Sequence, residues 1–173
     1  MKPTVLTGKP WLVTDETGRL IDDIDTDQIY HNAHLAVTDP KEMAKYAFGN
    51  LKGWEDFPKK VRPGDILFVG ENFGAGSSRQ HAVDCFLALG VAAIVGKSFG
   101  AIYKRNAINS GLPLLELPDM PLDALHSLDQ VTVNLKTGEI LRPDGAPIAR
   151  AVPMSKVALE IYQKGGLLKL AQG

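Results

Sequence analysis

Residues 74–80 (GAGSSRQ) combine two glycines, two hydroxyl groups and a guanidinium group, and this set could bind an anion. The first backbone N–H groups of a helix have no partner inside the helix and carry positive potential. Glycines let a ligand approach the backbone closely. Arg79 adds a planar set of donors that matches a carboxylate or a phosphate. The segment is therefore a candidate anion-binding loop.

The same segment also has a purely structural interpretation. Ser77 and Gln80 have the S-x-x-Q spacing of a capping box, which starts a helix without any ligand. This interpretation leaves Ser78, Arg79 and the two glycines unexplained. Two nucleotide-binding motifs are excluded, because no G-K-[ST] follows the loop and because a dinucleotide fingerprint needs a third glycine.

A second polar group lies upstream, where residues 22–27 (DDIDTD) contain four carboxylates. The spacing from Asp23 to Asp27 is that of a calcium loop, but Gln28 stands where such a loop needs glycine. This leaves a polar turn in which one carboxylate could be functional. His31 and His34 could together bind a metal, but the sequence places no third ligand beside them, and a loop is the simpler interpretation.

The elements that must position the glycine-rich loop follow from hydrophobic spacing. An apolar run at 66–69 predicts a buried strand, and apolar residues at helical spacing after Ser78 predict a helix that ends at Gly90. A strand at 91–95, a helix capped by Ser98 and a strand at 113–117 follow. This strand–helix–strand–helix–strand order predicts a parallel sheet.

The flanking regions add shorter elements. We expect an early strand at 11–13, a helix from Asp39-Pro40 to Gly49-Asn50 and a connecting loop at 51–63. A strand at 130–135, a hairpin turn at 136–139 and a C-terminal helix after 153–155 complete the chain. The predicted fold class is α/β, with a central mostly parallel sheet, flanking helices and an additional β hairpin. The length of 173 residues predicts a single domain over 1–173.

Composition restricts the class of function. The net charge of −1 gives no electrostatic sign of nucleic acid or of an anionic membrane as a partner. No apolar run approaches the length of a membrane span, and residues 1–4 lack the apolar core of a signal peptide, so we expect a cytoplasmic protein. The single cysteine, Cys85, cannot hold a zinc or iron–sulfur site alone, and we expect it to be a buried core residue.

Three segments in this order and spacing, residues 25–29, 70–82 and 98–113, resemble the family of 3-isopropylmalate dehydratase small subunits. These subunits correspond to the swivelling domain of the aconitase family. The likeness covers about residues 20–117, and the G-x-G-S-S-R element with an upstream T-D is more specific than a lone glycine loop. The resemblance implies a swivelling domain of the β/β/α type.

The resemblance also implies a division of labour between two chains. A separate large subunit carries a four-iron, four-sulfur cluster that acts as a Lewis acid, and this chain carries no cofactor or metal of its own. The implied reaction isomerises 2-isopropylmalate to 3-isopropylmalate by dehydration and rehydration, in leucine biosynthesis. Ser77 matches the family base and Asp27 the active-site aspartate. Thr26, Ser78 and Arg79 match substrate-binding positions.

The chain departs from the family pattern at three positions. Ala75, Gln80 and Ala101 stand where the family usually has cysteine, glutamate and often arginine. Ala36 and Val37 align with the loop that selects the substrate side chain, where homoaconitase-like members place arginine. Their apolar character favours a small branched alkyl group. The alternatives are a related dehydratase (homoaconitase, or one for another alkyl-malate or a citraconate-type acid), a non-catalytic anion-binding module and a capped turn in a structural protein.

Overall fold

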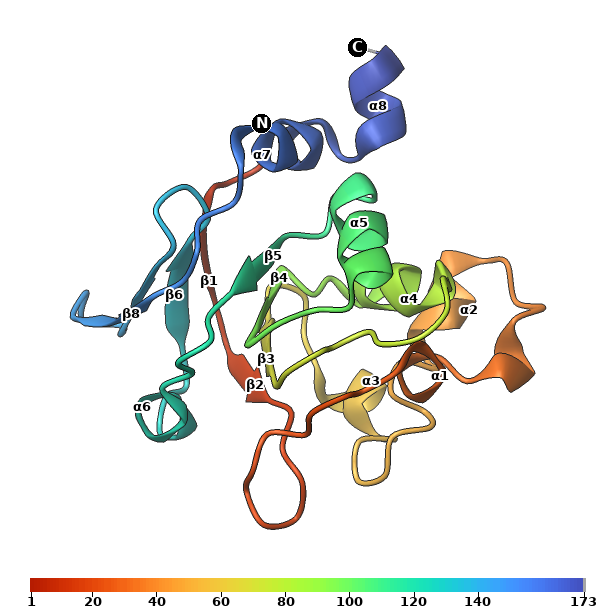
Figure 1. Cartoon of the computed structure of the whole chain (residues 1–173), viewed down its shortest axis with the longest axis horizontal. Coiled ribbons are helices and arrows are strands. Elements are labelled where there is room, and N and C mark those ends of the chain that lie inside the picture. The colour runs from red at the N-terminus through yellow and green to blue at the C-terminus, as the bar shows by residue number, and fades with distance from the viewer. Residues whose placement is uncertain (173) are drawn as a thin grey trace.

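The computed structural model describes residues 1–172, which form an antiparallel sheet, a parallel sheet and a layer of helices (Figure 1). The strands are β1 (Val5–Gly8), β2 (Pro10–Leu12), β3 (Ile66–Val69), β4 (Ala93–Gly96), β5 (Leu114–Glu116), β6 (Val131–Asn134), β7 (Glu139–Leu141) and β8 (Pro147–Arg150). The helices are α1 (Thr26–Ile29), the 3₁₀ helix η1 (Asn32–His34), α2 (Pro40–Ala44), α3 (Phe57–Lys60), α4 (His81–Leu89), α5 (Ala101–Asn109), α6 (Leu122–His126), α7 (Lys156–Lys164) and α8 (Leu167–Gln172).

The parallel sheet confirms the predicted alternation of strands and helices. Strands β2, β3, β4 and β5 pair in that order, and every pair is parallel. All residues of β3 and β4 are buried, because this sheet is covered on both faces. Continuous apolar runs such as 66–69 are the sequence pattern that such a sheet requires.

Side chains from the two faces of the parallel sheet enter two apolar clusters. On β3, Leu67 and Val69 pack with residues of α2, α4 and α5, whereas Ile66 and Phe68 pack with the antiparallel sheet. This split follows from the alternation of side chains along a strand. Figure 1 shows α4 and α5 on the face of the parallel sheet that points away from β6 and β8. The order of layers is therefore β/β/α, as the resemblance implied.

The antiparallel sheet has the order β1-β6-β7-β8, and β6 and β7 form the predicted hairpin. Its outer strands β1 and β8 were not predicted. In β1, Val5 pairs with Asn134, which lies far away in the sequence, so no local pattern identifies its partner. No helix among residues 1–172 is long and apolar enough to cross a membrane.

At α2 and α5, tertiary contacts override the local signals that predicted the helix boundaries. The helix that starts at Pro40 ends at Ala44 and not at Gly49; Phe48 has a positive φ of 58°, and its N–H donates to the Ile29 carbonyl oxygen at 2.7 Å. Ser98 does not cap α5: its hydroxyl oxygen accepts from the Asn72 N–H at 2.8 Å, and Gly100 occupies the cap position.

Candidate active site

The glycine-rich loop joins the end of β3 to the start of α4, and its backbone lies directly against α5. Gly74 has φ of +81°, and a Cβ atom there would lie 2.2 Å from the Tyr103 Cγ atom. A Cβ atom at Gly100, at the start of α5, would lie 2.7 Å from the Gly74 carbonyl oxygen. Only glycine therefore allows the loop to approach α5 this closely.

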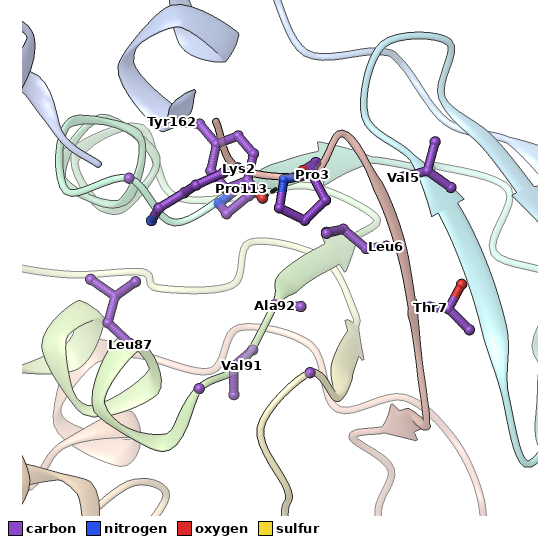
Figure 2. A pocket seen from close by; sticks show the side chains of 13 residues that line it. Lys2, Pro3, Val5, Leu6, Thr7, Leu87, Val91, Ala92, Pro113 and Tyr162 are labelled. Atoms are coloured by element: carbon purple, nitrogen blue, oxygen red, sulfur yellow. Dashed lines mark hydrogen bonds between the residues drawn. The ribbon is translucent and has the colours of Figure 1, made fainter. Parts of the chain in front are cut away.

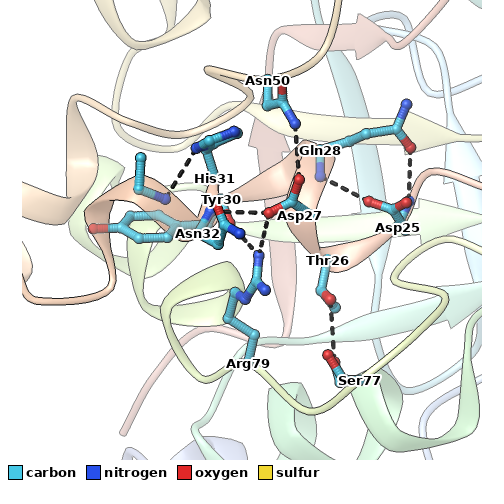
Figure 3. Close-up of polar contacts among 11 residues, drawn as sticks. Asp25, Thr26, Asp27, Gln28, Tyr30, His31, Asn32, Asn50, Ser77 and Arg79 are labelled. Carbon is cyan, nitrogen blue, oxygen red and sulfur yellow. Dashed lines mark hydrogen bonds and ion pairs between the residues drawn. The ribbon is translucent and has the colours of Figure 1, made fainter.

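The loop is also joined to the second polar segment found in the sequence. The N–H groups of Gly74 and Ala75 donate to the Ile24 carbonyl oxygen, and the Thr26 N–H donates to the Ala75 carbonyl oxygen at 3.0 Å. The buried Thr26 side chain donates from Oγ1 to the Ser77 carbonyl oxygen at 3.1 Å (Figure 3). The T-D segment and the S-S-R segment, far apart in the sequence, thus form one structural unit.

The predicted capping box of Ser77 and Gln80 is wrong. Helix α4 begins at His81, so Arg79 precedes its first turn, and no side chain caps the helix. The Gln80 Nε2 donates instead to Asp84 Oδ1 at 3.0 Å and to Ser110 Oγ at 2.7 Å. Gln80 therefore ties α4 to the end of α5, and this is its visible role at a position where the family has glutamate.

A capping box does occur in this unit, at the start of α1. The Asp25 side chain accepts from the Gln28 N–H at 2.8 Å, and the Gln28 side chain accepts from the Asp25 N–H at 2.9 Å. This box was not predicted, although D-x-x-Q follows the same rule as S-x-x-Q. It fixes the orientation of α1 and so places Asp27 toward Arg79.

Arg79 and Asp27 form the ion pair at the centre of the site (Figure 3). The Arg79 Nη1 donates to Asp27 Oδ1 at 2.9 Å and to the Tyr30 carbonyl oxygen at 2.7 Å. Asp27 also accepts from the Asn32 N–H and from Asn50 Nδ2, each at 2.9 Å. The bond from Arg79, followed by that from the Asn32 backbone, lowers the pKa of Asp27 from its ordinary value. Asp27 is therefore held as an anion that orients the arginine.

The two serines lie on the exposed side of the loop. The Ser77 hydroxyl makes no hydrogen bond to another residue within 1–172, whereas the Ser78 hydroxyl oxygen accepts from Asn106 Nδ2 at 2.9 Å. Within the same residues, the run of backbone N–H groups from Gly76 to Gln80 finds no acceptor. The loop thus presents free donors and one unpartnered hydroxyl to its surroundings, which is an arrangement that suits an anion.

The segment expected to select the substrate side chain lies beside the start of α4. Ala36 is exposed, while Val37 is half-buried against the helical cluster, and its carbonyl oxygen lies 3.0 Å from His81 Nε2. His34, the last residue of η1, stacks on Tyr46, which follows α2, with ring centroids 3.7 Å apart. The predicted loop is therefore a short 3₁₀ turn, and His34 has a packing role.

The described residues do not fit a metal or an iron–sulfur cluster. Residues 1–172 contain no group of three or more His, Cys, Asp or Glu side chains placed to hold a metal ion. Cys85 is fully buried in α4, as expected, and burial raises the pKa of its thiol. A cluster ligand must be an accessible thiolate, so Cys85 cannot serve as one.

The site is open at Ser77 and Ser78, which are exposed, and three cavities of the described residues lie elsewhere. One of about 510 Å³ lies between β1 and the end of α4, where the Tyr162 hydroxyl donates to the Pro3 carbonyl oxygen at 2.7 Å (Figure 2). A second of about 560 Å³ lies beside Trp54, and a third of about 240 Å³ lies beside Met154. None of the three is lined by a residue of the loop 70–80, so a reaction there would need a second surface to exclude water.

The fold and the site together define an aconitase-type domain, and the family of the aconitase C-terminal domain matches residues 21–120. Within this class, the chain belongs to the family of 3-isopropylmalate dehydratase small subunits. It is 40% identical over 167 residues to the 3-isopropylmalate dehydratase small subunit 1 of Methanopyrus kandleri. The matched residues cover 96% of this chain and 92% of that protein.

Two further comparisons extend the similarity. The isopropylmalate/citramalate isomerase small subunit of Methanocaldococcus jannaschii is 35% identical over 165 residues, 95% of this chain and 92% of that protein. A crystal structure of 3-isopropylmalate dehydratase from the same organism superimposes with a TM-score of 0.81 at 34% identity, over 97% of this chain and 93% of that one. The similarity therefore includes the antiparallel sheet as well as the loop region.

Proposed function

We propose that this chain is the small subunit of a hydro-lyase that isomerises 2-isopropylmalate to 3-isopropylmalate by dehydration and rehydration. The observation that carries the proposal is the joining of the T-D and S-S-R segments into one open anion site, in a chain 40% identical to a subunit of that name. The proposed setting is leucine biosynthesis in the cytoplasm.

In this proposal Arg79 binds a carboxylate of the substrate. A guanidinium group has about five N–H donors. The two N–H groups of Nη1 donate to Asp27 and to the Tyr30 carbonyl oxygen. The edge formed by Nε and Nη2 makes no hydrogen bond to residues 1–172 and matches a carboxylate in two-point geometry. Asp27 and Tyr30 thus hold the arginine so that the opposite edge serves the substrate.

Ser77 is the proposed base, which removes a proton from the carbon next to a substrate carboxylate and returns it during rehydration. A serine hydroxyl has a pKa far above neutral, so its alkoxide must be stabilised. The unpaired N–H groups of residues 76–80 and the charge of Arg79 provide positive potential beside it. These donors act most strongly once water is excluded, which requires a covering surface.

The proposed covering surface is a large subunit that carries the iron–sulfur cluster, in a heterodimer or heterotetramer. Support comes from the small-subunit names of the relatives, from the open site and from the misfit between this chain's residues and a cluster. Every contribution assigned to this chain is therefore one of binding, orientation or proton transfer.

The proposed substrate carries a small branched alkyl group, because the exposed Ala36 and the half-buried Val37 offer no charge to a further carboxylate. Citramalate is a second candidate, because the similar small subunit from M. jannaschii is named for both isopropylmalate and citramalate. The ratio of kcat/KM for the two acids distinguishes these possibilities.

Reconstitution tests the proposal. The chain is mixed anaerobically with the large subunit of the same organism and supplied with 2-isopropylmalate, and the absorbance of the unsaturated intermediate is followed. We expect activity with both chains and none with either alone. A chain that binds simple dicarboxylates but never associates with a cluster-bearing protein would instead be an anion-binding module.

A further inference from the structure

Asn106 of α5 reaches across to the exposed side of the glycine-rich loop. Its Nδ2 atom donates to Ser78 Oγ at 2.9 Å. Helix α5 is fixed against the same unit by the Tyr103 hydroxyl, which donates to the Ala82 carbonyl oxygen at 2.8 Å, and by the close approach of Gly74 to Tyr103. Asn106 therefore stands on a rigid element and makes a single side-chain contact with the site.

The chemistry of this contact sets the direction of the Ser78 hydroxyl. An amide nitrogen only donates, so Ser78 Oγ must accept from Asn106, and its own proton must point away from Nδ2. The Ser78 side chain is exposed on the open side of the loop, so that proton is available to an acceptor outside the chain. A carboxylate is acceptor-only and suits such a donor.

We propose that Asn106 is a positioning residue that makes Ser78 a hydrogen-bond donor to a carboxylate of the substrate. The inference rests on the proposed function, because it assumes that a carboxylate occupies this side of the loop. Asn106 does not touch the substrate and acts only through Ser78. The contact therefore affects binding, and its loss raises KM and leaves kcat nearly constant.

Two substitutions in the reconstituted complex test this assignment. Asn106→Ala frees the Ser78 hydroxyl and should raise KM about threefold, the effect of losing one neutral hydrogen bond. Asn106→Asp has the same shape but accepts a hydrogen bond, so it draws the Ser78 proton inward. The substrate carboxylate is then left without its donor, and KM should rise by more than about tenfold. A residue that only supports the fold gives the reverse order, with the isosteric aspartate milder than alanine.

A double-mutant cycle separates positioning from direct charge repulsion by the new aspartate. In the Ser78→Ala background, Asn106→Ala should raise KM by less than about twofold, and most of the effect of Asn106→Asp should disappear. Asn109→Ala, one turn later in α5, is the matched control and should leave KM unchanged. Melting curves and complex formation check each variant for folding.

The outcomes distinguish this inference from the proposed function. A wild-type complex that does not convert 2-isopropylmalate overturns the proposed function and the inference with it. An active wild-type complex in which Asn106→Asp matches wild type, or in which Asn106→Ala raises KM equally with and without Ser78, overturns the inference alone.

Discussion

At the scale of single residues, the polar contacts of the site converge on Arg79. One edge of its guanidinium group is fixed by Asp27 and the Tyr30 carbonyl oxygen, and its side chain is 15% exposed. A lysine ammonium is a single point of charge and cannot hold these two acceptors and a carboxylate in planar geometry at once. The shape of this side chain therefore matters as much as its charge.

The first prediction is that Arg79→Lys lowers kcat/KM of the reconstituted enzyme by about 100-fold, because two-point binding of the carboxylate is lost. Steady-state kinetics with 2-isopropylmalate measures the effect. Arg150→Lys is the matched control, since Arg150 lies on β8 with its side chain 68% exposed and only a 4.0 Å contact to Glu139. Equal activity of the Arg79 variant and wild type would remove Arg79 from the substrate site.

The second prediction concerns pH. The hydrogen bond from Arg79 lowers the pKa of Asp27 below its ordinary value of 3.8. A group with a lowered folded-state pKa contributes its stability above the unfolded pKa, and this contribution is lost as pH falls through the folded value. The stability difference between wild type and Asp27→Asn should therefore stay constant between about pH 5 and pH 8 and shrink only below about pH 4.

Urea unfolding at a series of pH values measures this difference. Its size should be about 0.5 kcal/mol, because the Asp27 side chain is 38% exposed and water screens the pair. Asp129→Asn, at an exposed side chain that makes no hydrogen bond or ion pair within residues 1–172, provides a control for general charge effects. A difference that already disappears between pH 7 and pH 5 would mean that the folded chain does not lower the Asp27 pKa.

At the scale of elements, the loop depends on its packing against α5. The third prediction is that Gly74→Ala destabilises the fold by about 3 kcal/mol, because it adds a clash with Tyr103 to the cost of a positive φ. Gly18→Ala is the matched control: it has φ of +86° but nothing within 4 Å of the added Cβ, so it should cost only about 1 kcal/mol. Chemical denaturation compares the two, and equal losses would show that the contact with α5 is unimportant.

The sequence predicted elements well where the pattern was local and continuous. The apolar runs that became β3 and β4, the Asp39-Pro40 start of α2 and the β6–β7 hairpin are examples. It was wrong at two predicted helix starts. The Ser98 hydroxyl accepts from the Asn72 N–H and does not cap α5. Gln80 binds Asp84 and Ser110 and does not close a capping box with Ser77. Strands β1 and β8 escaped prediction because distant pairing defines them.

The candidate site could be predicted only in part. The types and order of Asp27, Ser77 and Arg79 were enough to identify a family, but nothing local indicates that Arg79 would bind the Tyr30 carbonyl oxygen. Asn106 was missed as a site residue, because a helix seen in sequence gives no sign that it faces a loop 28 residues earlier. The sequence feature that could have identified Asn106 is its position in the predicted helix, one turn after Ile102 and Tyr103.

At the scale of the whole molecule, the parallel sheet contributes to both apolar clusters. Side chains of β3 alternate between them, so neither cluster can lose this strand without disturbing the other. The fourth prediction is therefore that residues 1–173 unfold as one cooperative domain. Trp11 and Trp54 report on the helical side, and far-ultraviolet circular dichroism reports on all elements.

The two signals should give the same denaturation midpoint, and Cys85 should become reactive to thiol reagents in the same transition, because it is fully buried when folded. Separate midpoints for tryptophan fluorescence and circular dichroism would instead show that the two sheets unfold independently.

The central claim is that this chain completes an active site shared with a large subunit by contributing Ser77. The most direct test is Ser77→Ala in the reconstituted complex. Since the Ser77 hydroxyl is exposed and makes no hydrogen bond within residues 1–172, the variant should fold, associate with the large subunit and keep its KM within about twofold. We predict that kcat falls by about 10³-fold, the contribution of a positioned base. Full activity of this variant would contradict the account.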